Sequence, residues 1–354
     1  MTATEILKVD PVNPKQEDID KAADILRRAG LVIMPTETVY GIAANMKNQK
    51  AMQRLCEIKR RPNHKPFSLL IDDKEKIEDF AADIPVAAYK LMAKFWPGPL
   101  TLVLASKTKG ETIGLRMPDN KIALRVIAAA KVPVVCPSAN LSGRPAPQDC
   151  ASALKDLNGL VNLAIDSGPT KLGIESTVVD LSDNSLLIAR EGAIKKSEIE
   201  AVTKKKTVLF VCTGNSCRSV MAKGLLETEL KKIGRKDVEV ISAGIAIIGG
   251  YRATQETVEL MQKQGIDVSG HFTQRISTEM IKRADIVLVM EKIHEARVIK
   301  LAPQVKNRVF LLKEFAKIED SNLDIADPIG KSFVEYEGTL NTIKQAIERV
   351  AKII

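Results

Sequence analysis

The amino-acid sequence predicts an α/β chain of two domains: an α+β domain with a twisted mixed sheet, then a doubly wound domain with a four-stranded parallel sheet. The length of 354 residues corresponds to two domains at roughly 150 residues each. A polar, charged segment at 193–206 separates two apolar-rich parts that do not resemble each other. After this segment apolar strands alternate regularly with amphipathic helices, whereas before it strands are many and long helices few. We therefore expect domains at 1–200 and 207–354, joined by a linker at 201–206.

The first domain opens with a helix over 17–29, because its apolar residues recur at helical spacing and Gly30 follows it. The apolar run 31–35 predicts a buried strand. Residues 49–59 predict a second helix, which ends before Pro62 because proline disfavours helix in the residue ahead of it. Further short apolar runs predict strands at 67–71, 100–105, 132–136 and 175–181.

The second domain begins with an apolar strand at 207–212, a short loop, and a helix over about 219–233 that ends at Gly234. The remaining pattern predicts strands at 238–244, 284–290 and 309–315, and helices at 253–264 and 333–352. Apolar strands that alternate with amphipathic helices predict a parallel sheet covered on both faces.

The composition favours some classes of binding partner and argues against others. The formal net charge of +9 favours anionic partners such as nucleotides, phosphoproteins or RNA. Only 13 of 354 residues are aromatic, which argues against base stacking as the main binding device. The three histidines and five cysteines contain no Cys-x-x-Cys pair and are too scattered for a metal site.

The expected compartment follows from cysteine usage and hydropathy. The N-terminus lacks the apolar stretch of a signal peptide, and no apolar run approaches 18 residues. An odd number of cysteines without a secretory segment points to a reducing environment. We therefore expect a cytoplasmic protein with no membrane partner.

The segment 212–219, CTGNSCRS, lies between a predicted strand and a predicted helix. Free backbone N–H groups and the helix dipole form an anion site at such a junction, and the same field stabilises a thiolate on Cys212. Arg218 can present a planar fork to two phosphate oxygens. Gly214 and Asn215 suit the positive φ angles of a tight loop. Together these features predict a phosphate-binding loop with a nucleophilic cysteine.

At this loop the sequence resembles the low-molecular-weight protein phosphatases, and the likeness extends through SAG (242–244), ADIVLVM (284–290) and the Asp-Pro-x-Gly at 327–330. The resemblance implies that Cys212 is the nucleophile, Arg218 binds the phosphoryl group and Asp327 is the general acid, without a cofactor. A phosphocysteine forms only if the departing atom is neutralised, so the chemistry also requires such an acid. The other residues of the phosphate loop would be Thr213, Gly214, Asn215, Ser216, Cys217 and Ser219. Val220 and Lys223 depart from the family pattern.

Two residues bear on the choice of phosphoprotein substrate. In the tyrosine-specific members an isoleucine lies in the loop and two tyrosines stand between Asp-Pro and glycine. Here Ser216 takes the isoleucine position, and Ile329 alone separates Pro328 from Gly330. This pattern is closer to the phosphoarginine phosphatases of the family. Phosphotyrosine remains the alternative, because Tyr251 can supply one aromatic wall.

In the first domain, predicted strand ends repeatedly carry polar or cationic side chains. PTETVYG (35–41) follows one strand, KRRP (59–62) follows a helix, and Ser138 and Asn140 follow another strand. Arg116, the segment GIESTVV (173–179) and Arg190 extend the pattern. Strand ends of this kind line a concave site for a polyanion.

These motifs, in this order, resemble the YrdC-type threonylcarbamoyl-AMP synthases over about residues 15–192. The family joins L-threonine, bicarbonate and ATP, releases pyrophosphate, and passes its product to partner proteins that modify tRNA. The resemblance places Lys59, Arg61, Ser138, Asn140 and Arg190 around ATP, with Thr36, Arg116 and Ser176 nearer the threonine. A Mg²⁺ ion would share the triphosphate.

Two alternatives stay open for this domain. Leu70 and Asn120 stand where many synthases have histidine, and KPFSLLI (65–71) leans toward the related YciO-type branch. The domain could instead be a nucleotide- or RNA-binding module without synthase activity.

Overall fold

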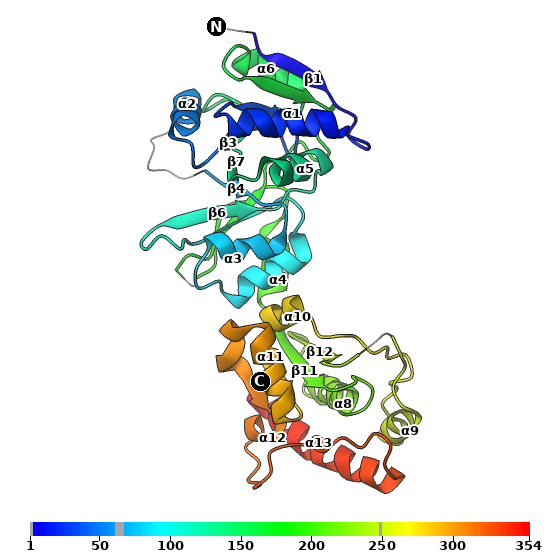
Figure 1. Ribbon diagram of the computed structural model, residues 1–354. Coiled ribbons are helices and arrows are strands. Elements are labelled where there is room, and N and C mark those ends of the chain that lie inside the picture. Colours follow the sequence, from blue (N-terminus) through cyan, green and yellow to red (C-terminus); the bar gives the residue numbers. More distant parts are fainter. Residues whose placement is uncertain (1–2, 61–66, 184, 248–249) are drawn as a thin grey trace. The chain divides into compact units, whose positions relative to one another are not determined.

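The structure is a computed structural model that describes residues 3–60, 67–183, 185–247 and 250–354 (Figure 1). The chain divides into two compact units, Met1–Val202 and Thr203–Ile354. Helix α7 (Lys196–Thr203) and strand β11 (Lys206–Cys212) occupy most of the polar segment between the two apolar parts. The expected linker at 201–206 therefore includes the end of one helix and the start of one strand. None of the described helices is long and apolar enough to cross a membrane.

The described residues of the first unit form one mixed sheet of ten strands in the order β1-β8-β2-β3-β7-β4-β6-β5-β9-β10. Its strands are β1 (Glu5–Lys8), β2 (Val32–Met34), β3 (Gly41–Asn45), β4 (Leu69–Leu70), β5 (Leu100–Ala105), β6 (Thr112–Arg116), β7 (Val134–Val135), β8 (Leu163–Asp166), β9 (Thr177–Asp180) and β10 (Leu187–Arg190). Pairs such as β2–β8 and β5–β9 are parallel, whereas β2–β3 and β5–β6 are antiparallel. This confirms the predicted mixed sheet.

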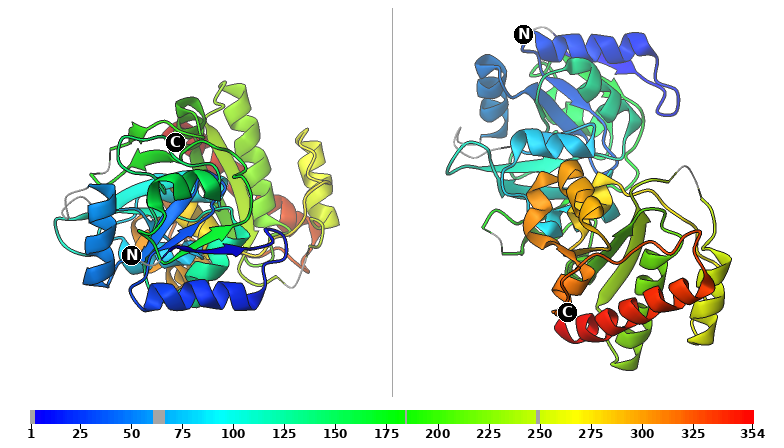
Figure 2. Two further views of the ribbon diagram at one scale, coloured as in Figure 1. Left: turned by 90° about the horizontal axis from the view of Figure 1, so that it is seen from above. Right: turned by 60° about the horizontal axis from the view of Figure 1, so that its bottom comes forward.

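Helices cover both faces of this sheet (Figure 2). They are α1 (Gln16–Arg27), α2 (Gln49–Lys59), a 3₁₀ turn at Lys74–Lys76, α3 (Ile77–Phe80), α4 (Val86–Phe95), α5 (Lys121–Ala130), α6 (Cys150–Leu157) and α7. Helices α1 and α5 pack on one face with Val32 and Met34 of β2, while Ile33 joins the core of α2, α4 and α6 on the other. Successive residues of a strand point to opposite faces, so the apolar run predicted at 31–35 supplies both cores.

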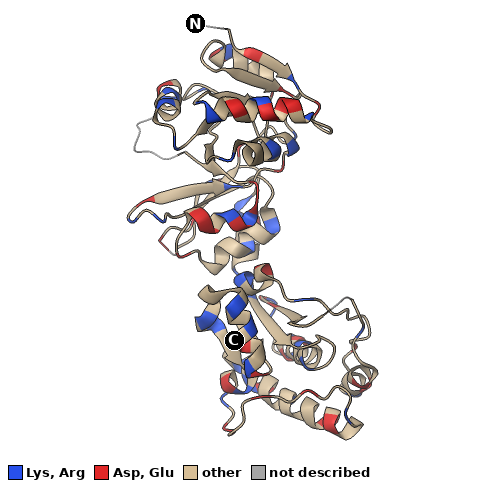
Figure 3. Cartoon of the chain, viewed as in Figure 1, with Lys and Arg blue, Asp and Glu red and all other residues tan. Residues whose placement is uncertain are grey.

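Charged residues of the first helix lie on its solvated side. Both acidic and basic residues lie along α1, and the Asp24 carboxylate pairs with Arg27 at 3.6 Å and with Arg28, just after the helix, at 2.8 Å (Figure 3). Exposed pairs of this kind contribute about 0–1 kcal/mol to stability. This helix face is therefore a solvated surface and not part of an anion site.

The second unit contains a separate sheet of four parallel strands in the order β12-β11-β13-β14. The remaining strands are β12 (Val238–Gly244), β13 (Ile286–Val289) and β14 (Val309–Leu311); the helices are α8 (Arg218–Lys232), α9 (Gln255–Lys263), α10 (Thr278–Arg283), α11 (Lys292–Leu301), α12 (Leu312–Phe315) and α13 (Phe333–Ile353), with a 3₁₀ segment at Pro303–Arg308. Helices α8, α9 and α13 pack on the face that carries Val208 and Phe210, and α10 and α11 pack on the face that carries Leu209 and Val211. This confirms the predicted doubly wound parallel sheet.

The predicted strands at 67–71 and 132–136 form only Leu69–Leu70 and Val134–Val135, and one further predicted strand turns partly into a helix. The apolar run 309–315 forms β14 only to Leu311, and Leu312–Phe315 form helix α12. The Glu314 carboxylate accepts the backbone N–H of Leu311 at 3.3 Å, which caps the helix start and diverts the chain from the sheet edge. Hydropathy alone does not separate these two outcomes for a short apolar run.

The strand order indicates where the second unit would bind a ligand. Connections from β11 run to β12 on one side and later return to β13 on the other, so the order reverses at β11. Crevices at such a reversal, beyond the carboxyl ends of the strands, are the usual ligand sites of open α/β sheets. The segment that follows β11 is 212–219.

Two candidate active sites

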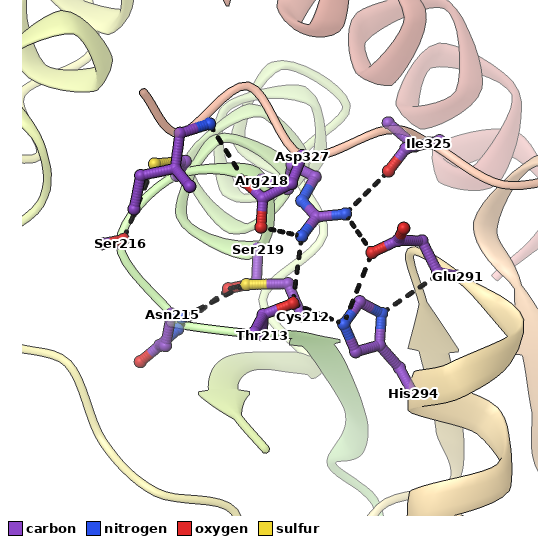
Figure 4. Close-up of polar contacts among 12 residues, drawn as sticks. Cys212, Thr213, Asn215, Ser216, Arg218, Ser219, Glu291, His294, Ile325 and Asp327 are labelled. Carbon is purple, nitrogen blue, oxygen red and sulfur yellow. Dashed lines mark hydrogen bonds and ion pairs between the residues drawn. The ribbon is translucent and has the colours of Figure 1, made fainter. Parts of the chain in front are cut away.

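The loop after β11 forms a closed cradle around the Cys212 sulfur (Figure 4). The Sγ atom lies 3.0 Å from the Ser219 hydroxyl and accepts the backbone N–H of Asn215 at 3.2 Å. Asn215 has a φ of 52°, and its side-chain amide donates to the hydroxyls of Ser219 and Ser242, both at 2.9 Å. Of the two residues expected at positive φ, Asn215 adopts it and Gly214 does not.

Close approach of the neighbouring strand explains the Ser-Ala-Gly motif at the end of β12. A Cβ atom at Gly244 would lie 2.6 Å from the carbonyl oxygen of Thr213. The backbone N–H groups of Ile245 and Ala246 donate to the carbonyls of Cys212 and Thr213, both at 3.0 Å. Glycine at 244 therefore lets β12 support the loop from the side.

Burial and hydrogen bonding have opposite effects on the pKa of the Cys212 thiol. Burial raises the pKa of the Cys212 thiol, while Ser219, the Arg218 charge and the Asn215 N–H act to lower it. The sequence led us to expect that the loop would favour the thiolate. The donors are present, but burial outweighs them here. Ionisation of Cys212 therefore depends on how these donors are arranged.

The Arg218 guanidinium is almost fully buried, at 1% exposure, and brings distant segments together. Its Nη1 donates to Glu291 Oε2 at 2.5 Å and to the Ile325 carbonyl at 2.7 Å. Its Nη2 donates to Thr213 Oγ1 at 3.2 Å and forms an ion pair with Asp327. The arginine and acid singled out from the sequence are thus in direct contact.

Sequence reasoning missed Glu291 and His294, which contact the cradle from the start of α11. His294 is fully buried, and its Nε2 lies 2.9 Å from Thr213 Oγ1. Glu291 comes two residues after the buried strand β13, whose carboxyl end lies at the same sheet edge as that of β11. Polar residues just after a second parallel strand were the signal that could have revealed them.

Because His294 is buried, we expect it to make stability depend on pH. Burial, followed by the Arg218 charge, lowers the pKa of His294 to about 4. The unfolded chain takes up this proton near pH 6.5 and the folded chain does not, so folding is favoured above pH 6.5 and weakens as pH falls toward 4. The expected loss is at most about 3 kcal/mol. Urea unfolding of wild type and His294→Gln at pH 7, 5.5 and 4.5 measures it; parallel curves for the two proteins would contradict this assignment.

The residues that bear on substrate choice lie at the opening of the cradle. The Ser216 carbonyl accepts the backbone N–H of Thr254 at 3.1 Å, which ties the segment carrying Tyr251 to the loop. Tyr251 and Ile329 are exposed, at 68% and 56%. Cys217 Sγ lies 3.5 Å from both the Thr254 and Tyr336 hydroxyls. Cys217 itself is buried, at 3% exposure.

A second candidate site is a cavity of about 170 Å³ in the first unit. Six of the residues predicted for this unit line it: Thr36, Lys59, Arg116, Ser138, Ser176 and Arg190. They come from segments that are up to 154 positions apart in the sequence. Arg61 lies outside the described residues. Asn140 is linked to the cavity through Lys59.

Lys59 organises the polar loop after β7. Its Nζ donates to the carbonyls of Ser138 and Asn140 at 2.8 and 2.7 Å, and to Asn140 Oδ1 at 2.9 Å. The ammonium group is buried. The Ser138 hydroxyl lies 3.4 Å from the same nitrogen, so Lys59 joins the backbone and side chains of the loop that lines this part of the cavity.

Two arginines lie elsewhere around the same cavity. Arg116 Nη2 is 2.7 Å from the Glu37 carboxylate and donates to Thr38 Oγ1 at 2.9 Å; both acceptors belong to the segment that follows β2. Arg190 donates to the Ser176 hydroxyl at 3.2 Å and the Glu175 carboxylate at 2.7 Å. Glu37 does not line the cavity but pairs with Arg116, which does; it was not singled out from the sequence, although it lies inside the motif at 35–41.

The two departures from the synthase pattern have different positions. Leu70 lines the cavity and is 4% exposed. Asn120 begins α5, where its Oδ1 accepts the backbone N–H of Ala123 at 3.0 Å. Asparagine at 120 therefore serves as a helix N-cap.

Comparisons with known proteins match each unit separately. The Sua5/YciO/YrdC family model, described as telomere recombination, matches residues 24–192. The model described as low molecular weight phosphotyrosine protein phosphatase matches residues 207–354.

Individual relatives agree with this division. The threonylcarbamoyl-AMP synthase of Bacillus subtilis is 41% identical over 202 residues, 54% of this chain and 58% of that protein, so the chain spans about three fifths of its length. The putative threonylcarbamoyl-AMP synthase of Methanocaldococcus jannaschii is 35% identical over 199 residues, 53% of this chain and 93% of that protein. The crystal structure of a low molecular weight protein tyrosine phosphatase from T. tengcongensis is 35% identical, covering 42% of this chain and 100% of that one with a TM-score of 0.40. The chain thus belongs to the Sua5/YciO/YrdC family through its first unit, and its second unit matches the family model of the low molecular weight phosphotyrosine protein phosphatases.

Proposed function

We propose that the first unit makes threonylcarbamoyl-AMP from ATP, L-threonine and bicarbonate, for modification of tRNA by partner proteins. The observation that carries this proposal is the cavity that Lys59, Arg116 and Arg190 line together with the hydroxyls of Thr36, Ser138 and Ser176. Relatives named as threonylcarbamoyl-AMP synthases support the choice of substrates. ATP would contact Lys59, Arg61, Ser138, Asn140 and Arg190, and threonine would contact Thr36, Arg116 and Ser176.

The cavity suits the charge changes of this reaction. The threonine amine adds to bicarbonate, water leaves, and a carboxylate oxygen of the carbamate attacks the α-phosphorus of ATP. The bond to the bridging oxygen breaks, and pyrophosphate departs with that electron pair. Lys59 and Arg190 would neutralise the charge that develops on the leaving group, so positioning and electrostatics supply the catalysis.

The cavity also fits a magnesium ion carried by the triphosphate. The Glu175 carboxylate and the hydroxyls of Thr36, Ser138 and Ser176 are oxygen donors, which Mg²⁺ prefers. When bound, the ion would neutralise phosphate charge. The protein residues would hold the nucleotide and the threonine around it.

One assay separates synthesis from simple nucleotide or RNA binding. A synthase releases pyrophosphate from ATP only when threonine and bicarbonate are both present, whereas a binding module or an inactive relative releases none. Absence of this dependence in the purified chain would overturn the synthase proposal.

We propose that the second unit is a cysteine-dependent protein phosphatase. The observation that carries this proposal is the contact between Arg218 and Asp327 beside the Cys212 cradle. Cys212 Sγ would attack phosphorus while Asp327 protonates the departing atom, which leaves a phosphocysteine. Asp327 would then take a proton from water, whose oxygen attacks phosphorus and releases phosphate and the Cys212 sulfur. Hydrolysis of phosphorylated amino acids by the purified chain, with transient labelling of Cys212, tests it.

We expect phosphoarginine to be preferred over phosphotyrosine, and Ser216→Ile to shift this preference toward phosphotyrosine. A hydroxyl at 216 can hydrogen-bond a guanidinium, whereas isoleucine offers apolar surface to a phenol ring. The expected change in the ratio of the two kcat/KM values is about tenfold or more. Ser216→Ala is the matched control, because it removes the hydroxyl without adding apolar surface. A wild type that favours phosphotyrosine tenfold would end the phosphoarginine proposal.

The five cysteines, all of them described, form no disulfide, which agrees with a reducing compartment. The proposed partners, ATP and tRNA-modifying proteins, agree with the same compartment. We therefore propose that the protein works in the cytoplasm.

A further inference from the structure

A closed ring of hydrogen bonds joins the start of α11 to the phosphate loop (Figure 4). The backbone N–H of Glu291 donates to His294 Nδ1 at 3.1 Å, and His294 Nε2 lies 2.9 Å from Thr213 Oγ1. Arg218 Nη2 donates to the same Thr213 oxygen at 3.2 Å, and Arg218 Nη1 donates to Glu291 Oε2 at 2.5 Å. The ring therefore returns to the residue at which it began.

The direction of each hydrogen bond follows from the first. Because His294 Nδ1 accepts a backbone N–H, the single proton of the neutral imidazole lies on Nε2. That proton is donated to Thr213 Oγ1, which also accepts from Arg218. With two donors directed at it, the Thr213 oxygen is fixed in place as an acceptor for the guanidinium. His294 thus acts on Arg218 through Thr213.

The ring also decides which edge of the guanidinium remains for a ligand. Glu291 Oε2 and the Ile325 carbonyl both accept from Nη1. Arg218 Nε is buried and has no hydrogen-bond partner among the described residues. Bidentate recognition of a phosphoryl group needs two adjacent nitrogens, and Nε with Nη2 is the edge that Glu291 leaves open. Asp327 pairs with Nη2 at this edge.

The two carboxylates on Arg218 consequently have different roles. As general acid, Asp327 must turn from Nη2 to the departing atom of the substrate. Asp327 then no longer compensates the buried guanidinium charge, and loss of an ion-pair partner is costly for a buried charge. Glu291 can stay on Nη1 throughout the reaction and keep this charge compensated.

We propose that Glu291 and His294 are positioning residues of the phosphatase, which hold the Nε–Nη2 edge of Arg218 toward the phosphoryl group when Asp327 moves to the leaving group. This inference rests on the proposed phosphatase function. A helix cap alone explains the contact between Glu291 and His294, but it does not require that Thr213 and Arg218 complete the ring.

The first test separates positioning from ground-state binding. In Glu291→Gln we expect kcat for a small phosphate ester to fall about 10–100-fold, because a misplaced catalytic group costs about this much. Affinity for vanadate, which resembles the transition state, should fall in proportion to kcat/KM, and affinity for inorganic phosphate should fall less. Glu295→Gln, one residue beyond His294 on the same helix, is the matched control and should change neither. Equal losses for phosphate and vanadate, or equal effects of Glu291→Gln and Glu295→Gln, would overturn the proposal.

A double-mutant cycle tests whether His294 acts through Thr213. Thr213→Val and His294→Phe should each lower kcat, and the double variant should be no slower than the slower single variant. His294→Gln, whose amide can donate to Thr213, should recover part of the loss. Fully additive effects would contradict a shared route, and thermal unfolding of each variant identifies any that fail to fold.

The proposed function and this inference fail in different ways. A wild type that hydrolyses no phosphate ester would refute the phosphatase proposal. In that case calorimetric binding of vanadate and phosphate to wild type and Glu291→Gln still tests the orientation of Arg218. An active wild type whose Glu291 and His294 variants are all unimpaired would refute the inference alone.

Discussion

Replacing Cys212 with serine is expected to abolish phosphate-ester hydrolysis while leaving the second unit folded. A serine hydroxyl ionises far less readily than a thiol, and loss of a nucleophile costs on the order of 10⁴-fold or more in kcat. The fold should survive because the two contacts of Cys212 Sγ, with Ser219 at 3.0 Å and the Asn215 N–H at 3.2 Å, are ones that a hydroxyl can also make. Single-turnover hydrolysis of a phosphorylated peptide measures the effect.

Phosphate binding is the control for this variant. Arg218 and the backbone N–H groups of the loop are unchanged in Cys212→Ser, so affinity for inorganic phosphate should stay within about tenfold of wild type. The effect of Asp327→Ala should depend on the leaving group. Turnover of esters with poor leaving groups should slow by about 10²–10⁴-fold, and turnover of esters with good leaving groups should slow less. Full hydrolytic activity in Cys212→Ser would refute the assigned nucleophile.

Removing the ammonium group of Lys59 is expected to eliminate pyrophosphate release by the first unit. In Lys59→Met the aliphatic stem remains, but the Ser138 and Asn140 oxygens lose their shared donor and the cavity loses one of its cations. Loss of an electrostatic contact to a developing charge costs about 10²–10³-fold. The measurement is pyrophosphate release from ATP that depends on threonine and bicarbonate.

Lys50→Met is the matched control for this prediction. Lys50 is exposed in the first turn of α2, so its loss removes one positive charge from the same helix without touching the cavity. Thermal unfolding should be checked in parallel, because unpaired buried carbonyls cost about 1–3 kcal/mol each. Turnover of Lys59→Met at the wild-type rate would show that the cavity is not the synthase site.

The sequence alone was sufficient where neighbouring residues build the structure. The loop 212–219 consists of consecutive residues between one strand and one helix, so the position of its backbone N–H groups and of Arg218 at the start of α8 follows from local geometry. Period-two and helical hydropathy likewise predicted β12 at 238–244 and α2 at 49–59 with the bounds that the structure has. The order of apolar strands and amphipathic helices was enough to predict a parallel sheet in the second unit.

Tertiary structure decided whatever depends on contacts between distant residues. Arg218 meets Glu291 and Asp327, which lie 73 and 109 positions away, and Lys59 meets Asn140 from 81 positions away. His294 became part of the site only because β13 lies beside β11, which brings the start of α11 to the same sheet edge. The run 309–315 turned into a helix after three strand residues because Glu314 caps it. Hydropathy reports which residues are buried, but the partner that each buried charge finds is set by strand order and packing, which no local pattern contains.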